Sequence, residues 1–352
     1  MSAVTSPLLT EPGAVPAEGL DAGVAAHYGD PYAEQRGTVS GWGVVDASNR
    51  GVLRITGPDR LSWLHNLTTQ HVESLAAGTG AEALVLSPQG HVEHHLTLTE
   101  DGSATWIHVE PDQAESLLKF LTSMQFMLRV DPQDVTADYA VLRLLGGALS
   151  AQQRPLAGEL VTAKVDLSYG TDLIVPRPEL AACVSELRAG GAVLAGTWAF
   201  EALRIASGRP RFGLDTDHRT IPHEVGWIET AVHMNKGCYR GQETVARVHN
   251  LGRPPRRLVL LHLDGSEDRL PGHGSAVVLD ETQVGSTGSA ARHYELGPIA
   301  LALVKRTTPA DAHLQADGIA AAQEVIVSAD AGANIQSELK RFRSGLIGRA
   351  RE

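Results

Sequence analysis

The chain has 352 residues, of which 43% are hydrophobic and 20% charged, and its formal net charge is −11. This length indicates two or three domains, and the composition allows a sizeable buried core. The acidic balance argues against direct binding to nucleic acid or to an anionic membrane surface. The two cysteines, Cys183 and Cys238, can form neither a disulfide framework nor a cysteine-rich zinc site. They also cannot supply the four ligands of a whole iron–sulfur cluster.

The N-terminal segment predicts a cytoplasmic chain. No apolar run approaches the ~20 residues that a membrane span needs. The first basic residue is Arg36, and acidic residues that include Glu11, Glu18, Asp21 and Asp30 precede it, unlike a secretory signal or a mitochondrial transit peptide. Residues 1–36 are rich in Ala, Pro and Gly, which predicts a loosely ordered N-terminal extension. The alternative is a strap across the body, anchored by Leu8, Leu9 and Tyr32.

Regular hydrophobic patterns follow and predict an α+β body over residues 37–255. In its first half, the predicted elements are a strand at 52–55, a helix from 58 to 67, a strand at 83–86, a turn at 87–90, a strand at 91–99 and a helix at 112–123. In its second half, they are strands at 141–145 and 173–175 and helices at 178–189 and 197–206. The order of elements repeats loosely, which predicts two similar halves divided near residue 138.

The pattern changes after Pro254 and Pro255. Short apolar runs alternate with Gly- and Pro-containing turns, which is typical of a small all-β barrel. The predicted strands lie at 258–263, 276–279, 299–304 and 324–327. We therefore place a C-terminal β-barrel at 256–332 and a basic tail at 333–352.

Residues 201–257 carry a net positive charge, although the chain as a whole is acidic. Ten basic residues stand there against six acidic ones, an excess of four positive charges in an acidic chain. The basic residues are Arg204, Arg209, Arg211, Arg219, Lys236, Arg240, Arg247, Arg253, Arg256 and Arg257. Guanidinium groups pair carboxylates bidentately, so the segment is a candidate site for a small anionic ligand. The alternative, which we expect for at least half of these arginines, is that they brace structural carboxylates.

Within this segment, residues 236–243 read Lys-Gly-Cys-Tyr-Arg-Gly-Gln-Glu. The glycines Gly237 and Gly241 imply a tight turn and an accessible thiol. Positive neighbours, above all Lys236, stabilise a thiolate, so Cys238 is a candidate reactive or metal-touching cysteine. A purely structural cysteine is the alternative. Cys183 stands in an apolar helical stretch and is predicted to fill the core.

Other motifs are weak. The sequence holds neither a phosphate-binding loop of the G-x-x-x-x-G-K-[ST] form nor a G-x-G-x-x-G after a strand. His94 and His95 are adjacent, so a strand would place them on opposite faces. We therefore predict no metal site.

Residues 236–243, with Val-Ala-Arg at 245–247, closely resemble the signature of the YgfZ family. Residues 203–210 and 221–224 are similar to the same family. The stretches 54–59, 67–69, 87–90 and 284–301 resemble the wider superfamily of aminomethyltransferases and folate-dependent demethylases. The resemblance covers roughly residues 40–330. It implies a three-lobed, aminomethyltransferase-like body of two folate-binding halves and a barrel, with tetrahydrofolate or another reduced folate in a central channel.

The sequence departs from the aminomethyltransferases at two positions. Those enzymes carry an aspartate pair where His94 and His95 stand, and a glutamate where this chain has Ala206. Without these carboxylates the obvious acid–base group for one-carbon transfer is missing, although a histidine could replace it as a base.

The resemblance therefore implies a folate-binding accessory protein that supports the assembly or repair of iron–sulfur clusters in other enzymes. Its partners would be iron–sulfur proteins or cluster-assembly factors, and an effect on tRNA modification would be indirect. The alternatives are a folate-dependent aminomethyl- or methyltransferase and a folate-sensing scaffold. Cys238 would act with Lys236 as its electrostatic partner, and Gly237 and Gly241 would shape the turn. By resemblance, the folate-channel candidates are Arg204, Glu224, Tyr239 and Arg247, while Gln242 and Glu243 would support the loop.

Overall fold

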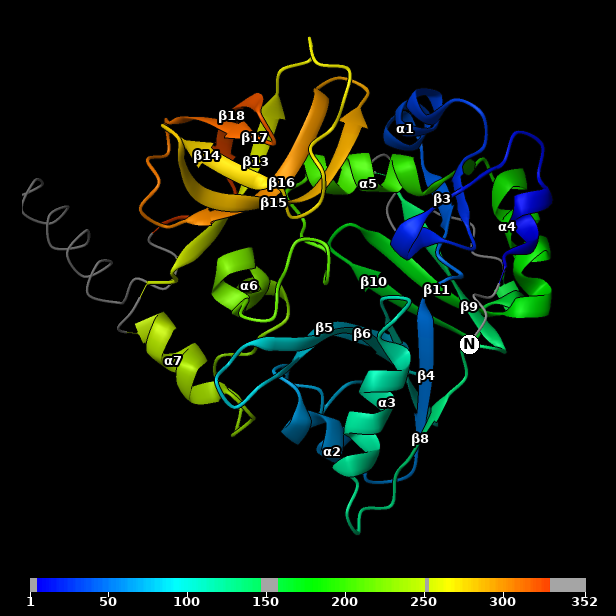
Figure 1. The fold of residues 1–352 in the computed structure, drawn as a ribbon. Helices are drawn as coiled ribbons and strands as arrows, with labels where there is room; N and C mark the ends of the chain where they lie inside the picture. The colour runs from blue at the N-terminus through cyan, green and yellow to red at the C-terminus, as the bar shows by residue number, and fades with distance from the viewer. Residues whose placement is uncertain (1–4, 147–157, 251–252, 330–352) are drawn as a thin grey trace, which may run out of the picture.

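The computed structural model describes residues 5–146, 158–250 and 253–329, and it forms three lobes with an N-terminal segment wrapped along one side (Figure 1). This confirms the predicted α+β body with a C-terminal β-barrel. The helices of the described residues are α1 (Pro31–Ser40), α2 (Arg60–Leu67), α3 (Ala114–Ser123), α4 (Leu180–Ala189), α5 (Thr197–Ala206), α6 (Trp227–Thr230) and α7 (Gln242–Asn250).

Lobe one is a five-stranded sheet in the order β5-β6-β7-β4-β8. Its strands are β4 (Gly51–Thr56), β5 (Thr79–Leu86), β6 (Val92–Glu100), β7 (Ala104–Val109) and β8 (Asp131–Asp134). Helices α2 and α3 cover one face, where Trp63, Leu117 and Leu121 join Leu53 and Ile55 in a single hydrophobic core. The leucines of α3 are four residues apart and so lie on one side of the helix. The predicted hairpin and both predicted helices of this half are confirmed.

Lobe two is a five-stranded sheet in the order β10-β11-β9-β3-β12. Its strands are β3 (Gly43–Asp46), β9 (Tyr139–Leu145), β10 (Ala163–Leu167), β11 (Gly170–Pro176) and β12 (Val193–Ala195). Strand β3 precedes lobe one in the chain, yet it pairs with β9 and β12 of lobe two. Backbone pairing therefore carries this short strand across the predicted division near residue 138.

The N-terminal extension is ordered from residue 5 onwards, so its prediction as a loose segment is wrong. A short helix η1 (Pro7–Thr10) and a hairpin of β1 (Val15–Pro16) and β2 (Ala25–His27) precede α1. Leu8 is buried in the core of lobe two, and the Ser6 hydroxyl donates to the Asp46 carboxylate at 2.5 Å. The strap alternative is thus correct for Leu8, whereas Leu9 is half-buried and Tyr32 is exposed.

The C-terminal lobe is a closed barrel in the order β13-β16-β15-β14-β17-β18, hereafter the barrel. Its strands are β13 (Arg256–Leu263), β14 (Ala276–Leu279), β15 (Thr282–His293), β16 (Gly297–Lys305), β17 (His313–Ala316) and β18 (Ile319–Val325). Its first strand begins at Arg256, and the strand predicted at 324–327 begins five residues earlier, at Ile319. The basic tail at 333–352 lies outside the described residues.

Candidate functional site

Residues 236–241, which we term the cysteine loop, lead directly into α7. The thiol of Cys238 is exposed, whereas Lys236 and Tyr239 on either side are buried. Tyr239 packs in the hydrophobic core between lobe one and the barrel, and burial raises its pKa to about 12. The loop therefore holds its thiol outward on two inward-pointing anchors, which confirms the predicted accessibility of Cys238.

Gly241 fits the loop against the turn of the β5–β6 hairpin. Its φ is +81°, and a Cβ placed there would lie 2.6 Å from the Ser87 carbonyl oxygen. Across the contact, Gly90 has a φ of +82°, and its Cβ would lie 2.6 Å from that of Thr244. Only glycine tolerates both the conformation and the approach. Gly237 has no atom within 4 Å of such a Cβ, so the predicted turn-shaping role finds a steric basis at Gly241 alone.

The Lys236 ammonium lies against the C-terminal end of α2. Its Nζ donates to the carbonyl of His65, to that of Thr68 at 2.5 Å and to that of Gln70 at 3.1 Å. Unpaired carbonyls at a helix C-terminus attract a cation. Burial lowers the pKa of Lys236 to about 8, and the charge of Glu73 partly opposes this shift. The Lys236 ammonium thus binds backbone carbonyls of lobe one. That it also stabilises a thiolate at Cys238 stays a prediction.

The remaining residues of the motif lie nearer the surface. Arg240 pairs with Glu93 of β6 at 2.8 Å, and both side chains are about one-third exposed. The Gln242 backbone N–H donates to the Tyr239 carbonyl at 3.2 Å, which closes the turn before α7. Glu243 and Arg247 are exposed on α7. Their predicted support and ligand roles stay predictions.

Arg204 and Glu224 are engaged by the protein itself. Arg204 donates to Glu201, Asp215, Ser289 and the Arg209 carbonyl, which uses every N–H of its guanidinium. Glu224 is fully buried and accepts from two nitrogens of Arg256 and from the Ile221 N–H. The geometry therefore assigns both residues to bracing and leaves Arg204 no donor for folate.

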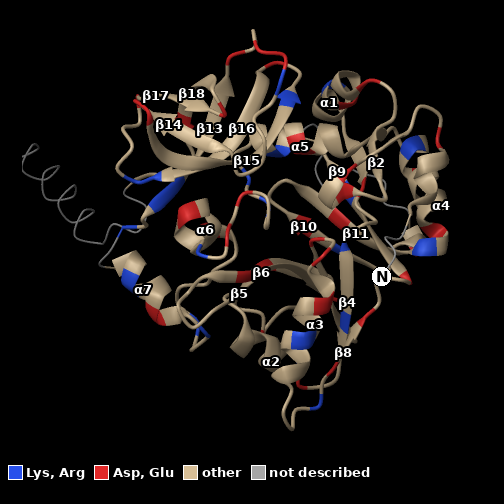
Figure 2. Cartoon of the chain, viewed as in Figure 1, with Lys and Arg blue, Asp and Glu red and all other residues tan. Residues whose placement is uncertain are grey.

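Arg211 extends this bracing across three parts of the chain. It pairs with Asp21 of the N-terminal segment at 2.7 Å, with Glu110 after β7 at 2.9 Å and with Glu201 of α5 at 3.2 Å. Although burial opposes ionisation, Arg211 and Arg50 lower the pKa of Glu110 well below its usual range. Figure 2 shows acidic and basic segments side by side around β4 and β11. We term the set Arg50, Glu110, Arg211, Glu201, Arg204 and Asp215 the arginine network.

The adjacent histidines of β6 lie on opposite faces, as predicted. His94 is buried towards α3, and its Nδ1 lies 3.1 Å from the Gln113 amide oxygen. On the other face, His95 stacks on the indole of Trp227 in α6, with ring centroids 4.6 Å apart and an interplanar angle of 9°. His95 Nε2 lies 3.3 Å from Glu82 Oε1. His95 and Glu82 therefore lie on the face of the sheet that is turned towards α6, in the interior between the lobes.

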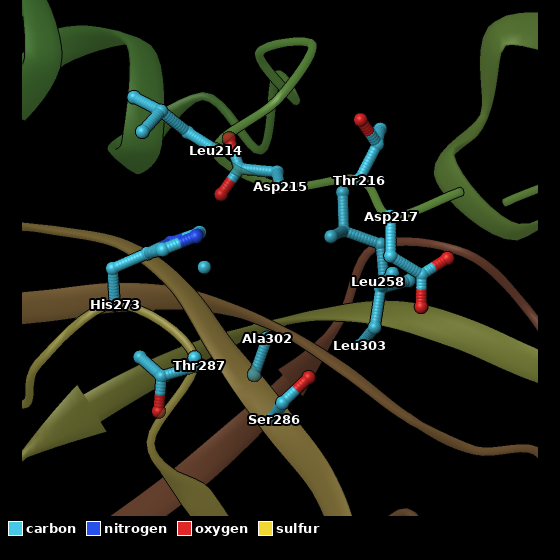
Figure 3. Close-up of a pocket in the computed structure, with 12 residues that line it drawn as sticks. Leu214, Asp215, Thr216, Asp217, Leu258, His273, Ser286, Thr287, Ala302 and Leu303 are labelled. Atoms are coloured by element: carbon cyan, nitrogen blue, oxygen red, sulfur yellow. The ribbon is translucent and has the colours of Figure 1, made fainter. Parts of the chain in front are cut away.

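A cavity of about 120 Å³ lies between the segment 214–217 and the barrel (Figure 3). Asp215 and Asp217 line it, with His273 and Thr287 on the barrel side. Both carboxylates are already paired, Asp215 with Arg204 and Asp217 with Arg256. Because this cavity is small and both of its carboxylates are already paired, it has little room and no free charged group for a ligand.

A larger cavity of about 210 Å³ lies beside α5, with Leu145, Phe200 and Leu203 on its apolar walls and Arg209 and Tyr169 as polar residues. The Arg209 guanidinium lies 3.3 Å from the centroid of the Tyr169 ring, and within the described residues it forms no ion pair. The sequence analysis counted Arg209 only among the ten basic residues of 201–257 and did not name Tyr169. A signal existed for Arg209, because no acidic residue lies within five positions of it.

Two negative findings apply to the part of the chain that the structure describes. No group of three or more His, Cys, Asp or Glu side chains is arranged to hold a metal ion. None of the helices there combines the length and the apolar character that a bilayer crossing requires.

Comparisons with known proteins agree with this architecture. The model of the GCVT N-terminal domain matches residues 23–163. In a crystal structure, the glycine cleavage system aminomethyltransferase T of Bartonella henselae has the same fold, with a TM-score of 0.76, 18% sequence identity and coverage of 92% of this chain and 98% of that one. The chain therefore has the fold of the aminomethyltransferases.

Curated proteins show further, more distant similarities. A chloroplastic protein of Arabidopsis thaliana with a provisional transferase name is 27% identical over 73% of this chain and 65% of its own length. An iron–sulfur cluster assembly factor IBA57 homolog of Mycosarcoma maydis, named as mitochondrial, is 25% identical over 64% of this chain and 58% of its own. The tRNA-modifying protein YgfZ of Shigella sonnei is 26% identical over 64% and 72%, respectively. The chain is thus similar to the GCVT N-terminal domain over residues 23–163 and, more distantly, to proteins named IBA57 and YgfZ.

Proposed function

We propose that this protein binds a reduced folate and supports the assembly or repair of iron–sulfur clusters in other enzymes, with Cys238 as its contact residue. The relatives named as a cluster assembly factor and as a tRNA-modifying protein support the role. The observation that carries the proposal is the exposed Cys238 on a loop whose neighbours Lys236 and Tyr239 are buried anchors. Such a loop presents a thiol in a defined place, as a contact with another protein requires.

The chemistry of the loop limits the role of Cys238. One exposed thiol cannot hold a whole cluster, so the contact is transient, shared with a partner's ligands, or redox. The other cysteine, Cys183, is fully buried in lobe two, and burial raises its pKa to about 11. It cannot join Cys238. With a net charge of −11, an effect on tRNA modification would arise through cluster-dependent enzymes.

The folate would bind between the lobes. Arg209 suits a glutamate carboxylate of its tail, and the apolar walls of the 210 Å³ cavity suit an aromatic ring. This cavity is smaller than a whole folate, so it would hold one part of the ligand. When bound, a reduced folate would supply one-carbon carrier chemistry.

A folate-dependent aminomethyl- or methyltransferase is the second candidate function. It is favoured by the His95–Glu82 pair, which offers an acid–base group where the aspartate and glutamate of the aminomethyltransferases are missing. One-carbon transfer to tetrahydrofolate that is lost on changing His95 would support this candidate. The cytoplasmic location stays a prediction, since two of the relatives are named as chloroplastic and mitochondrial.

The test compares the two cysteines in cells that lack their own YgfZ-like protein. Cys238→Ser should fail to restore the activity of cluster-dependent enzymes, because the contact residue is lost. Cys183→Ser is the matched control and should restore it, provided that immunoblots show equal amounts of the two variants. Full restoration by Cys238→Ser would refute the role of the thiol.

A further inference from the structure

Three histidine rings lie in contact where the segment before the cysteine loop meets lobe one. The rings of His65 and His71 meet edge to face with centroids 4.7 Å apart, and the rings of His71 and His233 have centroids 5.4 Å apart. His65 lies in the last turn of α2 and His71 follows that helix, whereas His233 precedes the cysteine loop. We term these three residues the histidine seam. It joins two segments that are distant in the sequence.

Hydrogen bonds fasten the same two segments to each other. The His233 backbone N–H donates to the Thr69 carbonyl at 2.9 Å, and the Thr69 hydroxyl donates to the Ala231 carbonyl at 2.6 Å. The Lys236 ammonium adds its bonds to the carbonyls at the end of α2. The position of the cysteine loop therefore depends on this contact with lobe one.

The seam has no place for a charged His65. The side chain of His65 is buried, and its Nδ1 is fully buried with no hydrogen-bond partner among the described residues. A protonated imidazole is a donor at both nitrogens, so the charged form would leave a buried N–H unpaired. The C-terminus of a helix ordinarily favours a charged histidine, but the Lys236 ammonium already occupies the carbonyls there.

The charges around His65 act in the same direction. Burial, followed by the charge of Lys236, lowers the pKa of His65 below its usual value of 6.5. His71 and His233 also disfavour the protonated ring. Glu73 favours it, but that side chain is exposed and solvent screens its charge. Protonation of the seam would therefore place like charges beside the Lys236 ammonium.

We propose that the histidine seam is a pH-sensitive contact, which holds the cysteine loop on lobe one while His65 is neutral and releases the loop when His65 is protonated. This inference goes beyond the proposed function, because it concerns how the loop is held and not what Cys238 contacts. Release exposes His65 to water, so the released state binds a proton more tightly than the docked state, and a lower pH favours release. The ratio of released to docked loop should rise by up to about tenfold for each pH unit below about 6.5.

The test is hydrogen–deuterium exchange, followed by mass spectrometry, between about pH 5.5 and about pH 7.5. In this range Lys236 largely keeps its charge, because its pKa is about 8. Exchange of residues 231–241 is divided by that of the same peptides in unfolded protein at each pH, which removes the intrinsic effect of pH on exchange. The wild-type loop should lose protection by up to about tenfold per pH unit at the acidic end, while β9 in the core of lobe two keeps its protection.

Variants at three histidines separate the seam from other effects of acid. His65→Gln should give a flat profile for the loop, because an amide does not titrate. His233→Gln removes one like charge from the other side of the seam and should reduce the loss of protection at about pH 5.5. His313→Gln, which changes an exposed histidine on β17, is the matched control and should keep the wild-type slope.

Circular dichroism and thermal melts establish that each variant is folded. A flat wild-type profile would overturn the inference, and so would a wild-type slope that persists in His65→Gln. Equal loss of protection in β9 and in the loop would also overturn it, because acid would then unfold the lobes as a whole.

Discussion

The arginine network and the cysteine loop come from the same basic stretch of sequence, residues 201–257, yet the structure uses them in opposite ways. In the network, Arg204 and Arg211 are buried and every charge meets a partner. In the loop, the buried residues are anchors, and the thiol of Cys238 remains exposed. A dense run of basic residues therefore marks the place where the lobes are joined. The accessible chemistry lies on the few side chains that this joining leaves unused.

This difference has an energetic reason. Burying a charge is costly unless it is paired, so a junction built from arginines must satisfy each of them. A saturated arginine has no donor left for a ligand, as Arg204 illustrates. The difference between the two regions can be tested at the network, at the loop and at the thiol.

Arg211→Met should have the largest effect. It leaves the carboxylates of Asp21, Glu110 and Glu201 without a common partner at the junction of the N-terminal segment with two lobes. Removing one partner of a buried ion pair costs about 3–5 kcal/mol in the free energy of unfolding. Urea denaturation followed by tryptophan fluorescence measures this loss.

The control is a second arginine at the surface. Arg129 makes a bidentate pair with Asp59, but its side chain is 74% exposed. Arg129→Met should leave the free energy of unfolding nearly unchanged, because exposed pairs are screened by solvent. Equal losses in the two variants would show that the network does not join the lobes as described.

Gly241→Ala should have the next largest effect. The added Cβ meets the Ser87 carbonyl at 2.6 Å and must also adopt a φ of +81°. The backbone strain and the overpacking together amount to about 2–4 kcal/mol. Gly237→Ala, four residues earlier in the same loop, meets no atom within 4 Å and should stay within ~0.5 kcal/mol of the wild type. Chemical denaturation of both variants measures the difference, and the reverse order would mean that the loop does not pack on the hairpin turn.

Local patterns predicted most of the helices and strands. The helix at 197–206 coincides with α5, and the strand at 52–55 lies within β4, because their apolar spacing repeats within a few residues. The errors have a common cause, since they involve contacts between distant parts of the chain. Strand β3 belongs to lobe two through its pairing with β9, almost a hundred residues later. The N-terminal segment is ordered through contacts such as that of Asp21 with Arg211.

In the candidate site, too, local features could be predicted and contacts between distant residues could not. The exposure of Cys238 and the burial of Cys183 could be predicted from their immediate neighbours, and both are confirmed. The carbonyls that hold Lys236 could not, because they lie about 170 positions away at the end of α2. The stacking of His95 on Trp227 likewise joins β6 to α6 across more than a hundred residues.

The last prediction concerns the two thiols and should leave stability unchanged. Treatment of the native protein with iodoacetamide near neutral pH should add one carbamidomethyl group, at Cys238, because that thiol is exposed. Cys183 should react only in denaturant, since it lies on the buried face of α4 and burial raises its pKa to about 11. Intact mass spectrometry counts the groups, and Cys238→Ser should remain unlabelled over the same time.

The rates at which the two thiols are labelled should also differ. If the loop is as firmly anchored as Lys236 and Tyr239 indicate, Cys238 is labelled from the native state, and its rate does not follow the unfolding equilibrium. Labelling of Cys183 must instead wait for an opening of lobe two, so mild urea should accelerate it. Arg211→Met should then speed the labelling of Cys183, which needs that opening, and leave that of Cys238 alone. A parallel acceleration of both thiols would mean that the cysteine loop also depends on the network, and that the two regions are not separable.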